Sequence, residues 1–292
     1  MQKQIRLCGY KPKEYEAVCH FLIELNKTDK SHINWNWARF EWMTEHPMFD
    51  KSKSGSIGLW KDSDKVVGAA IYDMYFGEAF CGVMPGYEAL YPEILDYAYR
   101  ELKDDSGLAI AIYDNNQTEM QAAENCGFVK SEQTETVMVI GLDKPLYAEL
   151  PEGLHFIEMD HNLEEDGHEL QWLFWQGFDH GTDREEFERQ EEIEPPNRPH
   201  FNKHLSIAAE NESGEKVSYC CLWYRKDTDY AYVEPVCTIP SYRGKGVAKA
   251  VIYEALDRAA KLGAKTAYVI SDMTFYEKLG FTKAYHYTFY RK

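Results

Sequence analysis

The second half of the chain repeats the first, and few folds are compatible with such a repeat. Three segments recur in the same order in the two halves. The matched pairs are GLWKDSDKVVGAAIYD (58–73) with LSIAAENESGEKVSYCCLWY (205–224), VMPGY (83–87) with TIPSY (238–242), and ENCGF (124–128) with EKLGF (277–281). The offsets at Val66–Val217, Pro85–Pro240 and Phe128–Phe281 are 151, 155 and 153 residues. This ordered self-similarity predicts two copies of one domain.

The length of the chain agrees with two domains. It has 292 residues, and domains have about 100–200 residues each. The pattern is interrupted at GLDKPLYAELPEG (141–153), which holds two prolines and two glycines. We therefore expect a first domain at residues 1–146 and a second domain at residues 147–292.

The second copy has the clearer pattern of helices and strands. Strands are expected at 153–159, 205–210, 216–225, 229–238, 266–271 and 282–290. Helices are expected at 165–195, 246–262 and 274–280. Pro195 ends the first of these helices and Gly263 ends the second. The order predicts an α+β fold in which each domain is a twisted mixed β-sheet flanked by helices.

A glycine-rich loop in the second copy is the strongest chemical signal. In AYVEPVCTIPSYRGKGVAKAVIYEAL (231–256), a predicted strand leads through the run RGKGVA directly into the long helix. Glycines let backbone N–H groups converge, and the N-terminus of a helix favours an anion. Arg243 and Lys245 add positive charge in an acidic protein. The loop is therefore predicted to bind phosphate.

Three kinds of phosphate loop have to be compared. A P-loop needs Ser or Thr after Gly-Lys, and no such run occurs. A dinucleotide fingerprint needs a third small residue at position 249, where Lys249 stands. The remaining pattern, Arg-x-x-Gly-x-Ala, resembles the pyrophosphate loop of the GNAT superfamily of acyl-CoA-dependent N-acetyltransferases. EPVCTIP (234–240) and FYEKLGF (275–281) resemble two further signatures of that superfamily.

The resemblance implies roles for individual residues. Backbone groups of Val236, Cys237 and Thr238 would pair with the pantetheine arm of acetyl-CoA, and Tyr276 would protonate or hydrogen-bond the departing thiolate. The pyrophosphate would be held by Arg243, Gly244, Lys245, Gly246, Val247 and Ala248. The alternative for Tyr276 is a core aromatic residue that precedes a helix-ending glycine.

An attacking amine must be neutral, which requires a base or a water path to one. Glu234, on the strand that leads into the loop, is the best candidate by position, and an ordinary carboxylate at a strand edge is the alternative. Asp179 and His180 are lesser candidates, because the superfamily usually builds its acceptor site in that region. For both of them a solvated loop is the plainer interpretation.

The first copy lacks these features. Glu88 stands where Arg243 does, Tyr91 where Gly246 does, and Ala123 where Tyr276 does. A carboxylate repels pyrophosphate, and a bulky side chain blocks close approach to the backbone. The first domain therefore resembles a degenerate GNAT domain with no cofactor loop, which would serve as a scaffold and as one wall of the acceptor site.

An aromatic segment in the first copy has two interpretations. In SHINWNWARFEWMTEHP (31–47), Trp35, Trp37 and Trp42 lie close together in sequence with Phe40. On one helix they would spread over more than one face, so they are not expected to enter a single core. They would form either a domain interface or an aromatic wall for an amine acceptor.

The charge and hydropathy of the sequence limit the classes of ligand and the location that we expect. With 32 Lys and Arg against 49 Asp and Glu, the formal charge is −17, which disfavours binding of nucleic acid and would attract a cation.

No apolar run is long enough for a membrane helix, and the first residues show no signal peptide, so we expect a soluble cytoplasmic protein. His200 and His204 lack an acidic partner at metal-ligand spacing, so no metal is expected. No signal for an oligomeric state is present.

Two functions are compatible with these features. The first is an N-acetyltransferase that moves an acetyl group from acetyl-CoA to the primary amine of a small cationic acceptor. The second is a non-catalytic acyl-CoA sensor or protein-interaction module. Acetylation of protein lysines is a third, weaker alternative, because two packed domains favour a closed cleft over an open peptide groove.

Overall fold

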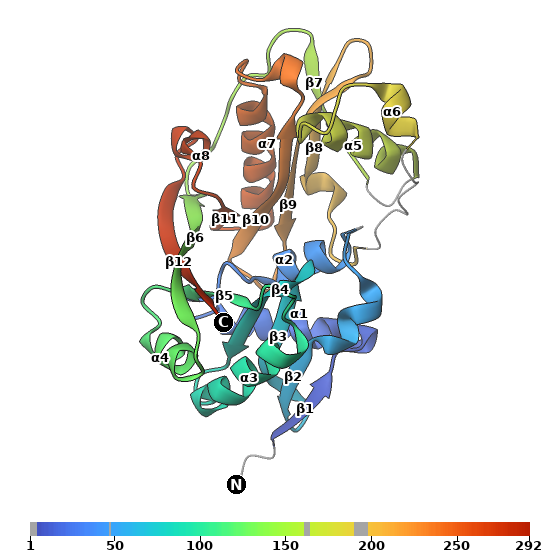
Figure 1. The fold of residues 1–292 in the computed structure, drawn as a ribbon. Helices are drawn as coiled ribbons and strands as arrows, with labels where there is room; N and C mark the ends of the chain where they lie inside the picture. The colour runs from blue at the N-terminus through green and yellow to red at the C-terminus, as the bar shows by residue number, and fades with distance from the viewer. Residues whose placement is uncertain (1–4, 47, 161–163, 190–197) are drawn as a thin grey trace. The chain divides into compact units, whose positions relative to one another are not determined.

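The computed structural model describes residues 5–46, 48–160, 164–189 and 198–292 (Figure 1). The chain divides into two compact units. The first contains residues 1–138, 270–273 and 283–292, and the second contains residues 139–269 and 274–282. Each unit is a mixed sheet with helices packed on it, which confirms the predicted fold class.

The second unit follows the predicted order of elements closely. Its strands are β7 (Leu154–Glu158), β8 (Ser206–Asn211), β9 (Lys216–Tyr224), β10 (Tyr230–Thr238) and β11 (Thr266–Ile270). Its helices are α5 (Glu164–Gly177), α6 (Arg184–Glu188), α7 (Val247–Leu262) and α8 (Thr274–Lys278), with short 3-10 turns η4 (Lys203–Leu205) and η5 (Pro240–Tyr242). The sheet order is β11-β10-β9-β8-β7. Neighbours are antiparallel except for the parallel pair β10 and β11.

The first unit has the same plan. Its strands are β1 (Ile5–Gly9), β2 (Gly58–Asp62), β3 (Lys65–Asp73), β4 (Tyr75–Val83), β5 (Ala109–Tyr113) and most of β6 (Val129–Gly141). Its helices are α1 (Tyr15–Leu25), α2 (Trp37–Thr44), α3 (Tyr91–Glu101) and α4 (Gln117–Asn125), with 3-10 turns η1 (Pro12–Glu14), η2 (Lys51–Ser56) and η3 (Glu88–Leu90). Antiparallel pairing runs from β1 to β4, and β4 is parallel to β5.

The repeat is also visible in individual hydrogen bonds. In the first unit the Phe128 N–H donates to the Ala123 carbonyl oxygen at 3.0 Å, and in the second Phe281 donates to Tyr276 at the same distance. The glycine before each phenylalanine, Gly127 or Gly280, has a φ of +85° or +87°. The segments ENCGF and EKLGF therefore both end a helix with the same backbone turn.

The last strand, β12 (Thr282–Arg291), belongs almost entirely to the first unit. It pairs antiparallel with β5, from Tyr287 opposite Tyr113 to Arg291 opposite Ala109. Leu108 and Lys292 exchange two backbone hydrogen bonds of 2.9 and 3.0 Å. A contiguous division into 1–146 and 147–292 would place this strand in the second domain, whereas the backbone pairing places it in the first unit.

One expected helix is shorter than its sequence pattern. Residues 165–195 were expected to form one helix, but α5 ends at Gly177, and α6 covers only Arg184–Glu188. Asp179, between the two helices, has a φ of +62°, outside the right-handed helical region. Residues 190–195 lie outside the described part of the chain.

The aromatic segment is not spread over a helix surface, which corrects the sequence prediction. Trp35 precedes α2 and stacks on Phe80 with ring centroids 5.3 Å apart. Phe40, inside α2, stacks on Tyr15 at 5.8 Å. Trp35, Trp37 and Phe40 are each 3% exposed or less, because the helix begins only at Trp37 and frees Trp35 to turn inward. Trp42 alone of the four is only half-buried.

Candidate functional site

In the second unit, β10 and β11 separate before β10 ends. Their parallel pairing covers only Tyr230–Thr266, Ala231–Ala267 and Tyr232–Tyr268, although β10 continues to Thr238. A shift in register between Val233 and Val236 marks an irregularity in the pairing of β10 with β9. An edge of β10 is thereby left open on the side of β11.

The direction of the backbone groups on this edge follows from two hydrogen bonds. The Ile239 N–H donates to the Val217 carbonyl oxygen at 3.0 Å, and Ser218 Oγ donates to the Cys237 carbonyl oxygen at 3.1 Å. Alternate residues of an antiparallel strand face the same neighbour. Cys237 therefore presents its backbone to β9, while Val236 and Thr238 present theirs to the open edge.

The glycine loop opens α7 as the sequence predicts. Gly246 is the N-cap residue, with a φ of +85° and without a capping side chain. Gly244 has a φ of +73°. A Cβ built on either glycine would meet no atom within 4 Å. The first N–H groups of this 16-residue helix, from Val247 and Ala248 onward, therefore face open space with the positive end of the helix dipole.

Arg243 is held by its surroundings and does not extend freely from the loop. Its Nε donates to the Thr238 carbonyl oxygen at 3.0 Å, and its Nη2 donates to the Gly177 carbonyl oxygen at 2.8 Å. Nη1 donates to the Asp179 carboxylate at 3.1 Å. The side chain thus links the end of α5, the end of β10 and the loop. Lys245, by contrast, is exposed, and its Nζ lies 4.9 Å from the centroid of the Tyr242 ring.

The end of α5 lies unusually close to β10. A Cβ on Gly177 would come within 2.7 Å of Cys237 Cβ and 2.8 Å of Cys237 Sγ. Only glycine permits this approach, which brings the carbonyl of residue 177 within reach of Arg243. Burial raises the pKa of the Cys237 thiol to about 12, with Arg243 opposing the shift, so the thiol stays protonated.

Tyr276 is buried next to the open edge. It lies in α8, is 8% exposed, and its ring packs edge-on against Phe275 and Phe281 at 5.1 and 5.5 Å. Burial, with smaller contributions from Cys220 and Glu234, raises its pKa well above the usual range. Its hydroxyl has no hydrogen-bond partner among the described residues. It is therefore a protonated donor that is available to a ligand.

Glu234 shares this environment. Its side chain is half-buried, and its Oε2 accepts a hydrogen bond of 3.2 Å from the Tyr232 hydroxyl. Trp223 Nε1 donates to its backbone oxygen at 2.8 Å. Because the Glu234 charge raises the pKa of Tyr276, the two groups interact electrostatically. Glu234 lies on β10 and Tyr276 on α8, near enough for the charge of one to act on the other.

Asp179 and His180 have different surroundings. Both are exposed, and the Asp179 carboxylate is taken up by Arg243, with Oδ1 2.9 Å from Nη2. The His180 ring lies 5.5 Å from the Trp175 ring. Asp179 therefore holds the arginine in place, and it is not free to act as a base.

Two residues near the site were missed by the sequence interpretation. Trp175 Nε1 and Gln176 Nε2, both on the last turn of α5, are buried without a hydrogen-bond partner in the described part of the chain. Gln176 is 6% exposed. The segment WQG (175–177) gave little indication of this burial. Glutamine is usually exposed on the surface of a protein, so a glutamine in a helix is not expected to be buried.

The corresponding positions of the first unit look different. Tyr91, the first residue of α3, is 3% exposed, and Leu90 is the N-cap without a capping side chain. Glu88 is exposed and accepts a hydrogen bond from the Gly86 N–H at 2.8 Å. Ala123 is fully buried in α4. A tyrosine ring and a carboxylate therefore occupy the positions where the second unit has glycine and arginine.

The two histidines considered for metal binding have separate partners. His204 Nδ1 lies 2.8 Å from Glu158 Oε1, and His200 Nε2 lies 2.9 Å from Arg225 Nη1. Among the residues that the structure describes, no group of three or more His, Cys, Asp or Glu side chains could hold a metal ion. Within the same residues, no helix combines the length and the apolar character needed to cross a bilayer.

Comparison with known proteins agrees with this geometry. The profile of the Acetyltransferase (GNAT) family matches residues 165–281, which include β10, the glycine loop, α7 and α8. A tandem GNAT protein from the clavulanic acid biosynthesis pathway superposes with a TM-score of 0.63 at 12% identity, covering 99% of this chain and 98% of that one. This segment thus matches the GNAT family, and the chain as a whole shares the fold of that tandem GNAT protein.

Two further GNAT relatives indicate how far the similarity reaches. A GCN5-related N-acetyltransferase from Sphaerobacter thermophilus has a TM-score of 0.58 at 16% identity, covering 99% of this chain and 95% of that one. The uncharacterized N-acetyltransferase YhbS of Escherichia coli K12 is 25% identical over 87 residues, which are 28% of this chain and 52% of YhbS. The chain thus spans about half the length of the curated relatives it matches, and both solved structures share its fold.

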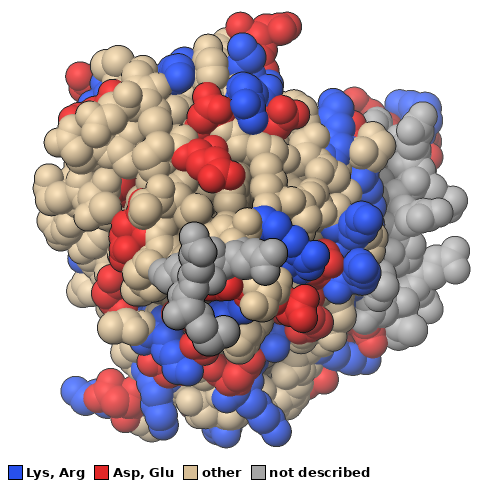
Figure 2. Space-filling model, turned by 90° about the horizontal axis from the view of Figure 1, so that it is seen from below, with Lys and Arg blue, Asp and Glu red and all other residues tan. Residues whose placement is uncertain are grey.

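Surface charge around the two units is mixed. Figure 2 shows Lys and Arg side chains interspersed with Asp and Glu over one face. On the coloured part of that face, positive charge is not gathered into a stripe of the kind that nucleic-acid-binding surfaces carry.

Proposed function

We propose that the second unit of this GNAT protein transfers an acetyl group from acetyl-CoA to the primary amine of a small cationic acceptor. The observation that carries the proposal is Gly246. It caps a long helix in a left-handed conformation, with open space where a side chain would stand. Such a helix N-terminus is suited to a pyrophosphate.

Contacts to an acyl-CoA would come from the glycine loop, the start of α7 and the open edge of β10. N–H groups of the glycine loop and of the start of α7 would hold the pyrophosphate, with the exposed Lys245 adding charge. The open edge at Val236, together with the Thr238 N–H, would pair with the amide groups of the pantetheine arm as an added strand does, while the Thr238 carbonyl oxygen stays with Arg243. Arg243 would contribute indirectly, because its side chain already holds the loop to α5 and β10.

In the reaction, a C–N bond to the acceptor forms, the thioester C–S bond breaks, and the acceptor loses a proton. Acetyl-CoA supplies the activated acetyl group and a thiol leaving group. A thiol has a pKa of about 8.5, and the pKa of Tyr276 is raised above that of ordinary tyrosine. Full proton transfer from Tyr276 to the thiolate is therefore uphill, so Tyr276 stabilises the departing sulfur mainly as a hydrogen-bond donor.

Glu234 would act on the acceptor. Its half-buried carboxylate, whose charge acts on Tyr276, would attract an ammonium group and receive its proton, directly or through water. The net charge of −17 would raise the local concentration of a cationic acceptor. Seven free cysteines support a reducing, cytoplasmic location for this reaction.

The test compares two glycine-to-alanine variants. Gly246→Ala places a Cβ where the pyrophosphate would lie, whereas Gly214→Ala, in the turn between β8 and β9, introduces the same left-handed strain far from the loop. The φ angles are +85° and +83°, and neither Cβ would meet an atom within 4 Å. We expect both variants to lose about 1 kcal/mol of stability. Only Gly246→Ala should raise the Kd for acetyl-CoA, by tenfold or more. Equal acetyl-CoA affinity in the two variants would contradict the loop assignment.

Turnover is tested separately with a panel of primary amines and an assay for release of free CoA. Release that depends on both acetyl-CoA and one amine supports the transferase. Acetyl-CoA binding without turnover on any amine would instead favour a non-catalytic acyl-CoA sensor.

A further inference from the structure

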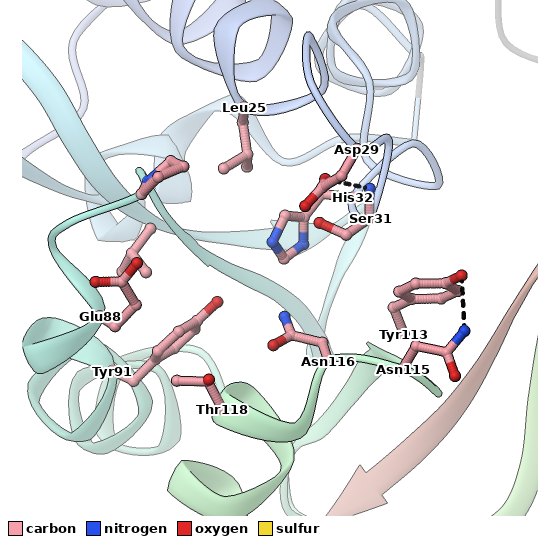
Figure 3. Close-up of a pocket in the computed structure, with 12 residues that line it drawn as sticks. Leu25, Asp29, Ser31, His32, Glu88, Tyr91, Tyr113, Asn115, Asn116 and Thr118 are labelled. Carbon is pink, nitrogen blue, oxygen red and sulfur yellow. Dashed lines mark hydrogen bonds between the residues drawn. The ribbon is translucent and has the colours of Figure 1, made fainter.

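A cavity of about 240 Å³ lies in the first unit, where β4 and β5 diverge (Figure 3). The two strands pair only at Glu78–Ala109 and Ala79–Ile110. The cavity is lined by Val83 at the end of β4 and by Tyr113 at the end of β5. In the GNAT fold this unit thus keeps an opening between its parallel strands, although it lacks the glycine loop.

A buried histidine, whose ring packs edge-on against Phe80 at 5.6 Å, faces this cavity. His32 is 7% exposed, and its side chain makes no hydrogen bond within the described residues. Figure 3 shows its ring pointing toward the space that Tyr91 and Asn116 also face. Burial lowers the pKa of His32 to about 4, so the ring is neutral and offers one donor and one acceptor. The ring nitrogens of His32 are not among the fully buried unpaired atoms of the described residues, so they are open to the cavity, where a ligand or water can bond them.

The opposite wall is a fixed polar network. Asn116 Nδ2 donates to Glu119 Oε2 at 2.8 Å, and the Glu119 N–H donates to Asn116 Oδ1 at 3.2 Å. Tyr91 also acts on the pKa of Glu119, which is 2% exposed and whose pKa burial raises well above its usual range. Tyr91 and Asn116 are therefore held in place before any ligand binds, as a preorganised site requires.

The charge of the lining selects against anions. Asp29 and Glu88 both line the cavity, and each carboxylate is oriented by a backbone N–H, from Ser31 at 2.9 Å and from Gly86 at 2.8 Å. The described lining residues include neither lysine nor arginine. The rings of Tyr91 and Tyr113 add faces that favour a cation. Phosphate groups of an acyl-CoA would be repelled here.

We propose that this cavity binds a small hydroxylated primary amine, with its ammonium group at Glu88 beside Tyr91 and a hydroxyl group on the imidazole of His32, on the Asp29 side of the cavity (Figure 3). The cavity volume suits a molecule of about ten heavy atoms rather than a nucleotide. Binding here requires no acyl transfer in the second unit, so the proposal stands or falls independently of the proposed function.

The test uses three probes that share an ammonium and at least one hydroxyl: ethanolamine, serinol and glucosamine. Glucose and glucuronate serve as uncharged and anionic controls. Binding is followed by NMR of the protein with ¹⁵N-labelled histidine, in which the His32 signal is assigned with His32→Gln. We expect at least one amine to shift the His32 signal with saturation below about 10 mM, whereas glucose and glucuronate leave it unchanged.

Variants locate the interaction. The double variant Asp29→Asn/Glu88→Gln, at two exposed positions, should raise the Kd for the amine about tenfold. Glu101→Gln, an exposed carboxylate at the end of α3 outside the cavity lining, should leave the Kd unchanged. Gly246→Ala should also leave it unchanged, because that loop lies in the second unit.

Four results would overturn the proposal: no shift of His32 with any of the three amines, equal shifts with glucuronate, a Kd that is unaffected by the double variant, or a shift of His32 with acetyl-CoA that competes with the amine. If His32→Gln does not fold, the signal is assigned by elimination with the other histidine variants, and the double variant still decides the outcome.

Discussion

Nη2 of Arg243 lies 2.9 Å from Oδ1 of Asp179, so the arginine of the glycine loop is neutralised by a carboxylate from the turn after α5. The same guanidinium reaches two backbone carbonyls, those of Gly177 and Thr238. Arg243 is therefore a positioning residue that fixes the loop between a helix end and a strand end.

This relationship predicts unequal effects for its two partners. Arg243→Ala removes all three contacts and should lower the free energy of unfolding by about 1–2 kcal/mol, because two partner carbonyls lose their donor. Asp179→Asn removes only a half-exposed ion pair and should cost less than about 1 kcal/mol. Urea unfolding measures both values. If Asp179→Asn is as damaging as Arg243→Ala, the backbone contacts do not carry the role given to them.

Tyr276→Phe tests the donor role of the hydroxyl. The ring contacts with Phe275 and Phe281 remain, and no hydrogen bond within the described residues is lost, so the thermal midpoint should stay unchanged. We expect kcat to fall about tenfold to a hundredfold with KM for acetyl-CoA nearly constant, because the donor acts on the departing sulfur. Full activity in this variant, measured on an amine that the wild type acetylates, would rule the role out.

Much of this site could be predicted from the sequence because its signals are local. A glycine loop before an apolar-periodic helix, Gly246 at the N-cap and Tyr276 before a helix-ending glycine are each read within a few residues. The approach of Gly177 to Cys237 joins positions 60 residues apart, and nothing in either neighbourhood indicates it. The reach of Arg243 to Asp179 is likewise a result of tertiary packing.

The position of the last strand shows the same limit at the level of the fold. The pattern at 282–290 predicts a strand correctly, but strand propensity carries no information about which strand it will pair with. The pairing of β12 with β5 places Tyr287 opposite Tyr113, a residue 174 positions earlier in the chain. Only the structure reveals that the first unit contains the end of the chain.

This pairing makes a prediction about fragments. Residues 1–146 alone lack β12 and leave the edge of β5 unpaired, so the fragment should give poorly dispersed amide NMR signals. Adding residues 282–292 through a flexible Gly-Ser linker should restore dispersed signals and a cooperative unfolding transition. Equal dispersion with and without the added strand would show that the first domain folds without it.

His32 predicts how stability depends on pH. Its pKa is lowered by burial from 6.5 to about 4, so the folded protein withholds a proton that the unfolded chain takes up. The contribution of this group to the free energy of unfolding is therefore complete above pH 6.5 and is lost as the pH falls toward 4. A shift of this size corresponds to roughly 3 kcal/mol.

The measurement compares urea unfolding of the wild type, His32→Gln and His20→Gln between pH 7 and pH 4. Because glutamine does not titrate, His32→Gln should lose clearly less stability over this range than the wild type, while replacement of the exposed His20 should leave the wild-type slope intact. Each protein serves as its own reference at pH 7, so a constant cost of the substitution cancels. Parallel slopes for all three proteins would mean that the His32 imidazole takes up a proton as readily in the folded protein as in the unfolded chain. A cavity that keeps this ring neutral would then be excluded.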